Sequence, residues 1–103
     1  MQIYRPREYS PPSSWEAIDI MRLDDATVRL HWTDQPYRWH VNDGPEVFVV
    51  LDGQVNMFVR GKDGESCISL GTGDVFHVAP GDEHKAEPLG AARVLVVERA
   101  ESI

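Results

Sequence analysis

Residues 39–53 read WHVNDGPEVFVVLDG, and this stretch decides the fold. The Asp43-Gly44-Pro45 segment in its middle is a turn signal, because glycine and proline supply the backbone angles that tight turns need. The residues after the turn, 46–52, are mostly apolar and rich in valine, which is typical of a buried strand. We therefore expect two strands joined by a short turn here.

The rest of the chain repeats this rhythm of short apolar or alternating segments separated by Gly, Pro or Asp. Only residues 14–22 raise the question of a helix, and the alternation of Ile18 and Ile20 with Asp19 favours a strand. The pattern therefore predicts an all-β protein with no internal repeat. The expected strands are residues 15–23, 27–33, 37–42, 46–52, 54–60, 65–70, 74–79, 83–87 and 92–99.

The strand at residues 46–52 is apolar on both faces. Val47 and Val49 point one way, and Phe48 and Val50 point the other. One face would fill the interior of a barrel, and the other would need cover from another strand or subunit. Residues 94–97 are also apolar on both faces and need cover in the same way, so we expect a homodimer.

Length and charge limit the possible functions. The chain has 103 residues, which suits one domain, and its 17 acidic and 10 basic residues give a net charge of -7. We expect no nucleic-acid partner, because this charge opposes binding to phosphates, and no membrane partner, because no apolar run approaches the roughly 20 residues of a spanning helix. Residues 1–12 carry charges and prolines where a secretory signal is apolar, which predicts a cytoplasmic protein. The single cysteine, Cys67, is expected to be half-buried and structural.

Four side chains have a spacing that a mononuclear metal site can use. His40 and Asn42 lie two apart on one strand and share a face, and the following turn returns Glu46 toward them. His84 follows a second turn and can reach the same point from a strand that closes over the first. Two imidazoles and a carboxylate bind divalent transition metals such as Fe, Mn, Ni, Co, Cu or Zn. The alternative is that these are ordinary polar residues at turns.

The two turn regions resemble the sequence motifs of the cupin family. In residues 39–53, His40, Glu46 and Gly53 match the first motif, and in residues 73–84, GDVFHVAPGDEH, Gly73, Gly81 and His84 match the second. The resemblance implies a double-stranded β-helix, or jelly-roll barrel, that holds one divalent metal. It also implies a single cupin domain over residues 1–103, with an N-terminal arm and strands in 1–26 and the barrel in 27–99.

The chain departs from the first motif at Asn42, which stands where the family has a second histidine. The resemblance therefore implies His40, Glu46 and His84 as metal ligands, with Asn42 as a weak amide ligand. Either a metal site of three strong ligands or a barrel without metal fits this change, and we favour the metal site.

Several other residues are candidates for lining a substrate pocket, although a barrel core needs the same side chains. They are Tyr37, Trp39, Phe48, Met57 and His77. A structural or outward position is favoured for His77, between Phe76 and Val78. His31 lies on a polar face, for which we favour solvent over the barrel interior.

Two functions remain open at this point. One is a dioxygenase- or isomerase-like enzyme whose metal acts on a small oxygenated molecule. The other is a non-catalytic protein that binds or senses a small ligand, with weak metal binding or none. The missing histidine and the lack of an identifiable general acid or base favour the second. No catalytic residue beyond the metal ligands is assigned from the sequence.

Overall fold

The computed structural model describes residues 1–100 and contains nine strands within them. A short 3-10 helix, η1 (Pro6–Glu8), precedes the strands. The strands are β1 (Ala17–Leu23), β2 (Ala26–Thr33), β3 (His40–Val41), β4 (Glu46–Asp52), β5 (Val55–Gly61), β6 (Gly64–Leu70), β7 (Val75–Val78), β8 (Glu83–Pro88) and β9 (Ala92–Arg99). The predicted all-β fold is confirmed, and η1 is the element that the sequence pattern missed.

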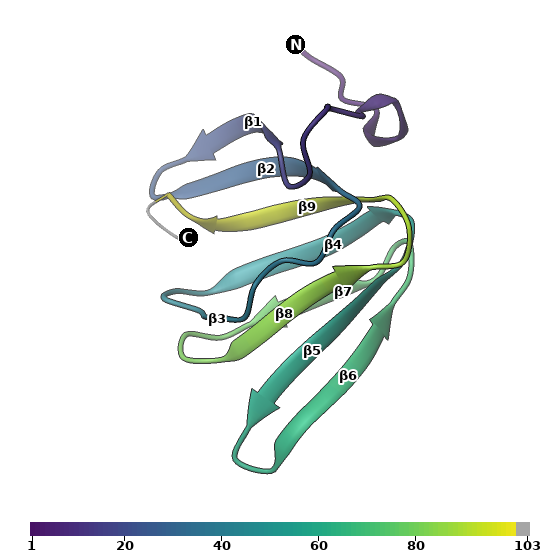
Figure 1. Cartoon of the computed structure of the whole chain (residues 1–103). Helices are drawn as coiled ribbons and strands as arrows, with labels where there is room; N and C mark the ends of the chain where they lie inside the picture. The colour runs from purple at the N-terminus through teal and green to yellow at the C-terminus, as the bar shows by residue number, and fades with distance from the viewer. Residues whose placement is uncertain (101–103) are drawn as a thin grey trace.

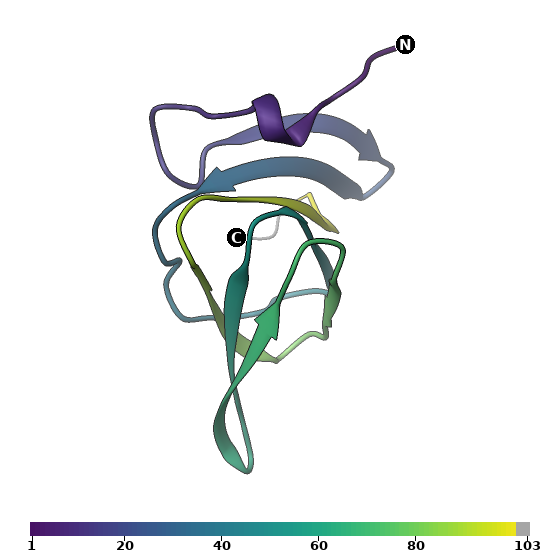
Figure 2. The ribbon, with the colours of Figure 1, turned by 90° about the vertical axis from the view of Figure 1, so that its right-hand side faces the viewer.

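The strands form two antiparallel sheets that face each other as a jelly-roll barrel (Figures 1 and 2). The five-stranded sheet has the order β1-β2-β9-β4-β7, and the four-stranded sheet has the order β3-β8-β5-β6. Strand β4 lies between β9 and β7, so a segment from the middle of the chain pairs with the last strand. This pairing places the turn before β4 at one end of the barrel, beside β3 and β8.

The core lies between the two sheets. Strand β4 contributes Phe48 and Val50, both buried, while the alternate residues Val47 and Val49 remain half-buried on the outer face. The outer face is thus apolar without full cover within residues 1–100. The homodimer expected from this pattern stays a prediction. The buried core cluster is Phe48, Val50, Val55, Met57, Leu70, Ala86, Ala92, Val94 and Val96.

The strand predicted at residues 37–42 is much shorter than expected, because only His40–Val41 pairs in the sheet. The chain crosses from β2 of one sheet to β3 of the other in this region, so most of the segment has no neighbouring strand along its length. The backbone N–H of Tyr37 instead donates to the carbonyl oxygen of Ala86 at 2.9 Å. A single sequence carries no sign of this crossover.

The turn end of the β5–β6 hairpin projects away from the rest of the barrel (Figure 2), whereas the start of β5 lies in the core with Val55 and Met57. Strand β6 is an edge strand, and its residues from Gly64 to Ser69 are exposed. Cys67 is exposed with them, so the half-buried position expected for it is wrong. The alternating pattern correctly predicts a strand, but neither face of residues 64–69 is buried, and only Leu70 at the end of β6 reaches the core.

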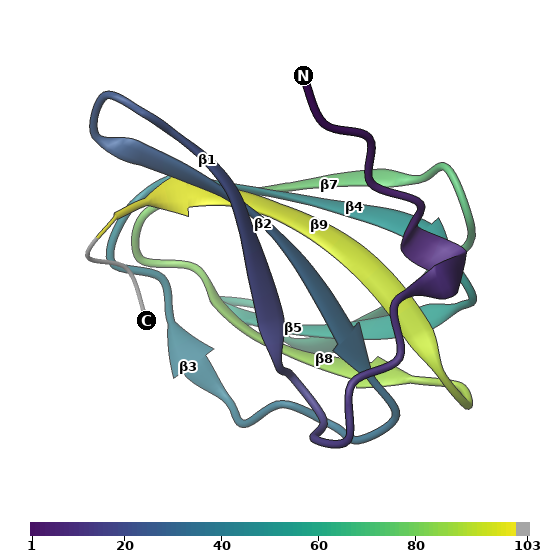
Figure 3. The ribbon, with the colours of Figure 1, turned by 90° about the horizontal axis from the view of Figure 1, so that it is seen from above.

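The N-terminal arm lies against the five-stranded sheet (Figure 3). Arg93 of β9 anchors it, since its guanidinium donates to the carbonyl oxygen of Tyr9 at 3.1 Å and to the hydroxyl of Ser10 at 2.7 Å. The same guanidinium pairs with Asp52 at 3.0 Å, which ties the arm to the end of β4. Within residues 1–100, no helix has the length and apolar character to span a membrane.

Candidate metal centre

The fold brings together three of the four predicted ligands. His40 of β3 and His84 of β8 are direct partners in the antiparallel pair, so their side chains leave the same face of the sheet. Their ring centroids are 4.2 Å apart. Glu46 begins β4 in the opposite sheet, and its Oε1 lies 3.6 Å from His84 Nε2. One potential ligand atom from each of the three residues lies within 4.8 Å of the other two.

The surroundings of the two imidazoles leave ring nitrogens available for a metal. His40 Nδ1 lies 3.2 Å from the carbonyl oxygen of Arg38, so a proton on Nδ1 leaves Nε2 free as a ligand. Burial lowers the pKa of His40, which favours the neutral ring. Within residues 1–100, His84 Nδ1 is buried and has no hydrogen-bond partner. A buried ring of this kind is costly unless an ion or water satisfies it, so the residues present fit a divalent metal.

A second carboxyl group, that of Glu98, lies beside the cluster. Glu98 of β9 is the direct cross-strand partner of Glu46, and its Oε1 is 3.9 Å from the guanidinium of Arg29. Burial and then the neighbouring Glu46 raise the pKa of Glu98 to about 8. Burial alone would also raise the pKa of Glu46, but the polar side chains of His84 and Glu98 outweigh this and lower it. In the metal-free protein near neutral pH, Glu46 is therefore the ionised member of the pair.

The pKa of Glu98 predicts how the stability of the metal-free protein depends on pH. The ordinary pKa of a glutamate is 4.5 and the pKa of Glu98 in the folded chain is about 8, so between these values the folded state binds the additional proton. The contribution of Glu98 to the free energy of unfolding therefore falls as the pH rises from about 5 to 8. Denaturant unfolding of chelator-treated protein at several pH values measures this slope.

A Glu98→Gln variant isolates the contribution of this carboxyl group. The pKa values of His31 and His40 are lowered by burial, which makes stability rise with pH through their ordinary range and opposes Glu98. The relevant quantity is therefore the difference between the parent protein and the variant. This difference should favour the variant increasingly toward pH 8, and parallel pH curves for the two proteins would contradict the assignment.

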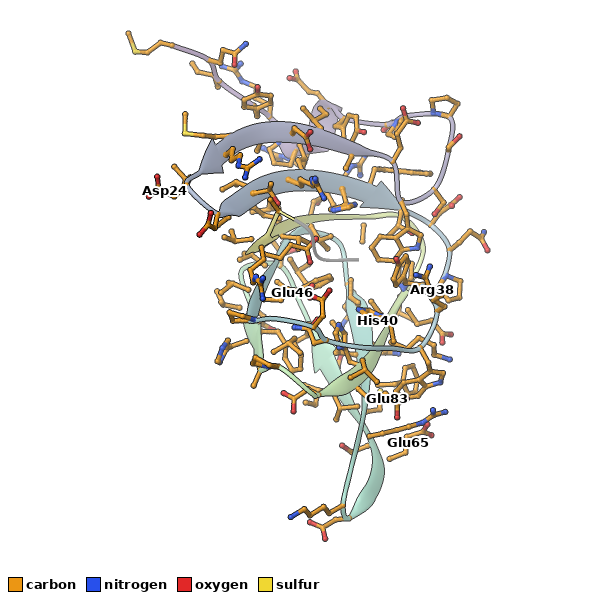
Figure 4. All side chains as sticks on the ribbon, turned by 90° about the vertical axis from the view of Figure 1, so that its left-hand side faces the viewer. Asp24, Arg38, His40, Glu46, Glu65 and Glu83 are labelled. Atoms are coloured by element: carbon orange, nitrogen blue, oxygen red, sulfur yellow. The ribbon has the colours of Figure 1, made fainter. Side chains whose placement is uncertain are left out.

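The cluster opens on a cavity of about 160 Å³ inside the barrel. Of the predicted pocket residues, Tyr37, Phe48 and Met57 line it, whereas Trp39 and His77 do not. Trp39 instead packs under Arg60, whose guanidinium carbon lies 3.7 Å from the ring centroid. His77 is exposed on β7, as favoured from its sequence position. Figure 4 shows Glu46 and His40 pointing into the barrel.

Comparison with protein-family models gives one match, to the family described as Cupin domain, and it spans residues 26–98. The chain belongs to the cupin family. The matched range begins with β2 and ends within β9, so it contains all three clustered residues and the strands that position them. No curated protein matches the chain.

Solved structures of other cupin-like proteins share the fold. A cupin-2 domain containing protein from Shewanella frigidimarina is 24% identical, with a TM-score of 0.76 over 84% of this chain and 82% of that one. A putative mannose-6-phosphate isomerase from Ralstonia eutropha is 13% identical, with a TM-score of 0.76 over 96% and 98%. Hydroquinone 1,2-dioxygenase from Sphingomonas sp. TTNP3 is 17% identical, with a TM-score of 0.78 over 88% of this chain and 29% of that one. These identities establish the fold and no more.

In this cupin barrel, Asn42 takes a place different from that of the clustered side chains. It is buried, but it does not line the cavity. Its side-chain amide donates to the carbonyl oxygen of Gly44, which holds the turn before β4. Its backbone N–H donates to the backbone carbonyl oxygen of Asp82 at 2.8 Å, which joins the end of β3 to the turn before β8. Coordination by Asn42 stays a prediction, and the geometry offers it another role.

Five residues that line the cupin cavity were not predicted as its lining: Trp15, His31, Ala86, Val96 and Glu98. His31, for which solvent was favoured, lines the cavity with Trp15 and Glu98. Arg29, His31 and Thr33 alternate along β2 and mark one polar face of that strand. This face points into the barrel, so the alternation could have indicated that His31 lines the cavity. Glu98 continues the inward alternation of Val94 and Val96 in β9. Trp15 precedes the first strand, and no pattern marked it.

Proposed function

We propose that this cupin is a metal-dependent enzyme that acts on a small oxygenated molecule, in the manner of a dioxygenase or an isomerase. His40, Glu46 and His84 are the proposed ligands of one divalent metal, which is Fe, Mn, Ni, Co, Cu or Zn. The observation that carries the proposal is their convergence at the wall of a cavity in the barrel. A cluster on an open surface would bind metal without creating a place for a substrate.

The side chains around the cluster support this role. A bound metal would supply Lewis acidity or oxygen chemistry, and a set of two histidines and one carboxylate leaves coordination positions open for a substrate. Phe48 and Met57 keep the inner part of the cavity apolar, which limits water near the cluster. The carbonyl oxygen of Arg38 orients the His40 ring for coordination through Nε2.

The cupin relatives support the reaction class without fixing the substrate. One solved relative is named a hydroquinone 1,2-dioxygenase and another a putative mannose-6-phosphate isomerase. The present chain spans 29% of the dioxygenase chain, and a shared barrel supports many different activities. The alternative is a non-catalytic barrel that binds a small ligand. The observation that favours the alternative is Asn42, which stands at the family's second histidine and holds a turn.

Turnover by the metal-loaded protein separates the two functions. The chain is loaded anaerobically with Fe(II), Mn(II) or Zn(II), and oxygen uptake and isomer formation are followed with hydroquinones, diketones and free sugars. We expect metal-dependent turnover with at least one of these classes and none with a His84→Ala variant. Binding of these compounds without turnover, for every metal, would replace the enzyme proposal by the ligand-binding one.

A further inference from the structure

Resting on the proposed metal site, we propose a substrate class for the same cavity: a single flat ring with its oxygen atoms at one edge and no charge at the opposite edge. The oxygen-bearing edge faces His40, Glu46 and His84, and the uncharged edge faces the aromatic wall made by Trp15 and Tyr37. Phosphorylated sugars and rings with a carboxylate at the far edge are excluded. This class is narrower than the small oxygenated molecules considered above.

The size of the cavity matches one ring. Its volume is about 160 Å³, and a cavity of about 150 Å³ in another protein takes up benzene. Met57 and Phe48 form part of its lining and are buried in the barrel core, so the space cannot expand without disturbing the core. A ring with one or two small substituents fits this space.

Aromatic rings form a continuous wall from the outer part of the cavity to the metal cluster. Trp15 and Tyr37 meet edge to face with centroids 5.2 Å apart, and Tyr37 meets His40 at 5.2 Å with perpendicular planes. His40 in turn lies against His84, at 4.2 Å between ring centroids. A flat ring gains stacking or edge contacts along such a wall, in addition to the burial of its surface.

Trp15 is fixed in this wall before any ligand binds. Its φ of 63° lies in the left-handed region, which is unusual for a bulky side chain and often marks a functional position. Its backbone N–H donates to the carbonyl oxygen of Trp32 at 2.8 Å, and its indole N–H donates to that of Gln35 at 2.9 Å. The second bond sets the plane of the indole, so the wall presents a defined surface to a ring.

The charge of the lining excludes a second anionic group. Within residues 1–100, no lysine or arginine lines the cavity, whereas two glutamates, Glu46 and Glu98, do. The nearest charge partner of Glu98, Arg29, is already paired with Asp19 at 2.8 Å. The guanidinium carbon of Arg38 lies 5.0 Å from the Tyr37 ring centroid, but Arg38 does not line the cavity. A phosphate or carboxylate at the far edge of the ring would therefore lie against Trp15 and Tyr37 without a cationic partner in the lining, which is costly.

Two nearly isosteric rings test the inference. The Zn²⁺-loaded full-length protein is titrated with 4-methylcatechol and with 3,4-dihydroxybenzoate, which share the oxygen pair and differ by a methyl group against a carboxylate at the other edge. Calorimetry should give a Kd at least about tenfold lower for 4-methylcatechol, and mannose 6-phosphate should bind more weakly than either. Equal or tighter binding of 3,4-dihydroxybenzoate or of the sugar phosphate would overturn the inference.

Tryptophan variants test the aromatic wall separately. Trp15→Leu should raise the Kd for 4-methylcatechol by about tenfold, whereas Trp39→Leu, outside the cavity, should leave it unchanged. Equal effects of the two substitutions would overturn the role of Trp15. If Trp15→Leu does not fold, the comparison of the two rings with the parent protein still decides the substrate class.

Failure of the metal site and failure of the ring preference can be told apart. Zn²⁺ uptake is measured first by calorimetry without any ring compound, and its absence would contradict the proposed function alone. In that case the metal-free protein is titrated with p-cresol and 4-hydroxybenzoate, which also differ only by methyl against carboxylate. Preference for p-cresol would support the inference on the cavity walls, and no preference would overturn it.

Discussion

Replacing Glu46 by glutamine is expected to lower the affinity for divalent metal by more than about 100-fold. Substituting a partner outside the coordination shell typically costs about 10- to 100-fold in affinity, and loss of a ligand charge should exceed this. Glu46 is buried, and its Oε1 lies 3.6 Å from His84 Nε2. The neighbouring Glu98 is not a member of the group whose ligand atoms converge, so the loss of the Glu46 charge is expected to be felt in full. Competition with a chelator of known affinity measures the change.

Two further variants make the Glu46→Gln result specific. Glu65 lies on the exposed β5–β6 hairpin, where it pairs with Arg60, and Glu65→Gln should bind metal like the parent protein (Figure 4). Asn42→Ala removes an amide that is bonded to Gly44 and should change the affinity by only a few-fold. An unchanged affinity in Glu46→Gln would remove Glu46 from the ligand set, and a large loss in Asn42→Ala would make Asn42 a ligand.

Replacing Gly53 by alanine is expected to destabilise the fold by about 2–5 kcal/mol. Gly53 connects β4 to β5 and has a φ of 94°, which residues with a side chain rarely adopt. A Cβ atom there would also lie 2.7 Å from the carbonyl oxygen of Ala91. Because that contact is with backbone, relief requires a shift of the segment that precedes β9. Denaturant unfolding of the metal-free protein measures the loss.

Gly64 provides a matched control for Gly53. Its φ of 100° is similar, but a Cβ atom there would have no neighbour within 4 Å. Gly64→Ala should therefore cost only the backbone strain, about 1–2 kcal/mol. The difference between the two variants gives the cost of the close approach at Gly53. Equal losses would mean that the backbone at Ala91 yields freely and that the φ angle alone selects glycine.

The sequence was sufficient to predict the strands other than the one at residues 37–42, because their signals are local. The strand from Glu46 to Asp52 was predicted with the bounds that the structure has. Its valine-rich run lies between two turn signals, Asp43-Gly44-Pro45 and Asp52-Gly53. The convergence of His40, Glu46 and His84 was also predicted, from two turns whose spacing is visible in the chain and resembles the cupin motifs. The residues of the two turns were thus enough to predict the three proposed ligands.

The rest of the cavity depends on pairing between distant segments, which local patterns do not encode. Glu98 reaches Glu46 only because β9 pairs with β4. Trp15 reaches the cavity because its backbone N–H donates to the carbonyl oxygen of Trp32, which holds it in an unusual conformation ahead of β1. The face of β2 that carries His31 could be recognised as polar, but its direction was set by the β2–β9 pairing.

The most direct test of the central claim is elemental mass spectrometry of the protein purified without an affinity tag, beside a His84→Ala variant. We predict close to one equivalent of a divalent transition metal per chain in the parent protein and almost none in the variant. His84 is buried at the cluster, and within residues 1–100 the group of converging ligand atoms consists of His40, Glu46 and His84, so removing one imidazole leaves two ligands. A parent protein without metal that also takes up none on reconstitution, or a variant with the same metal content as the parent, would contradict the claim.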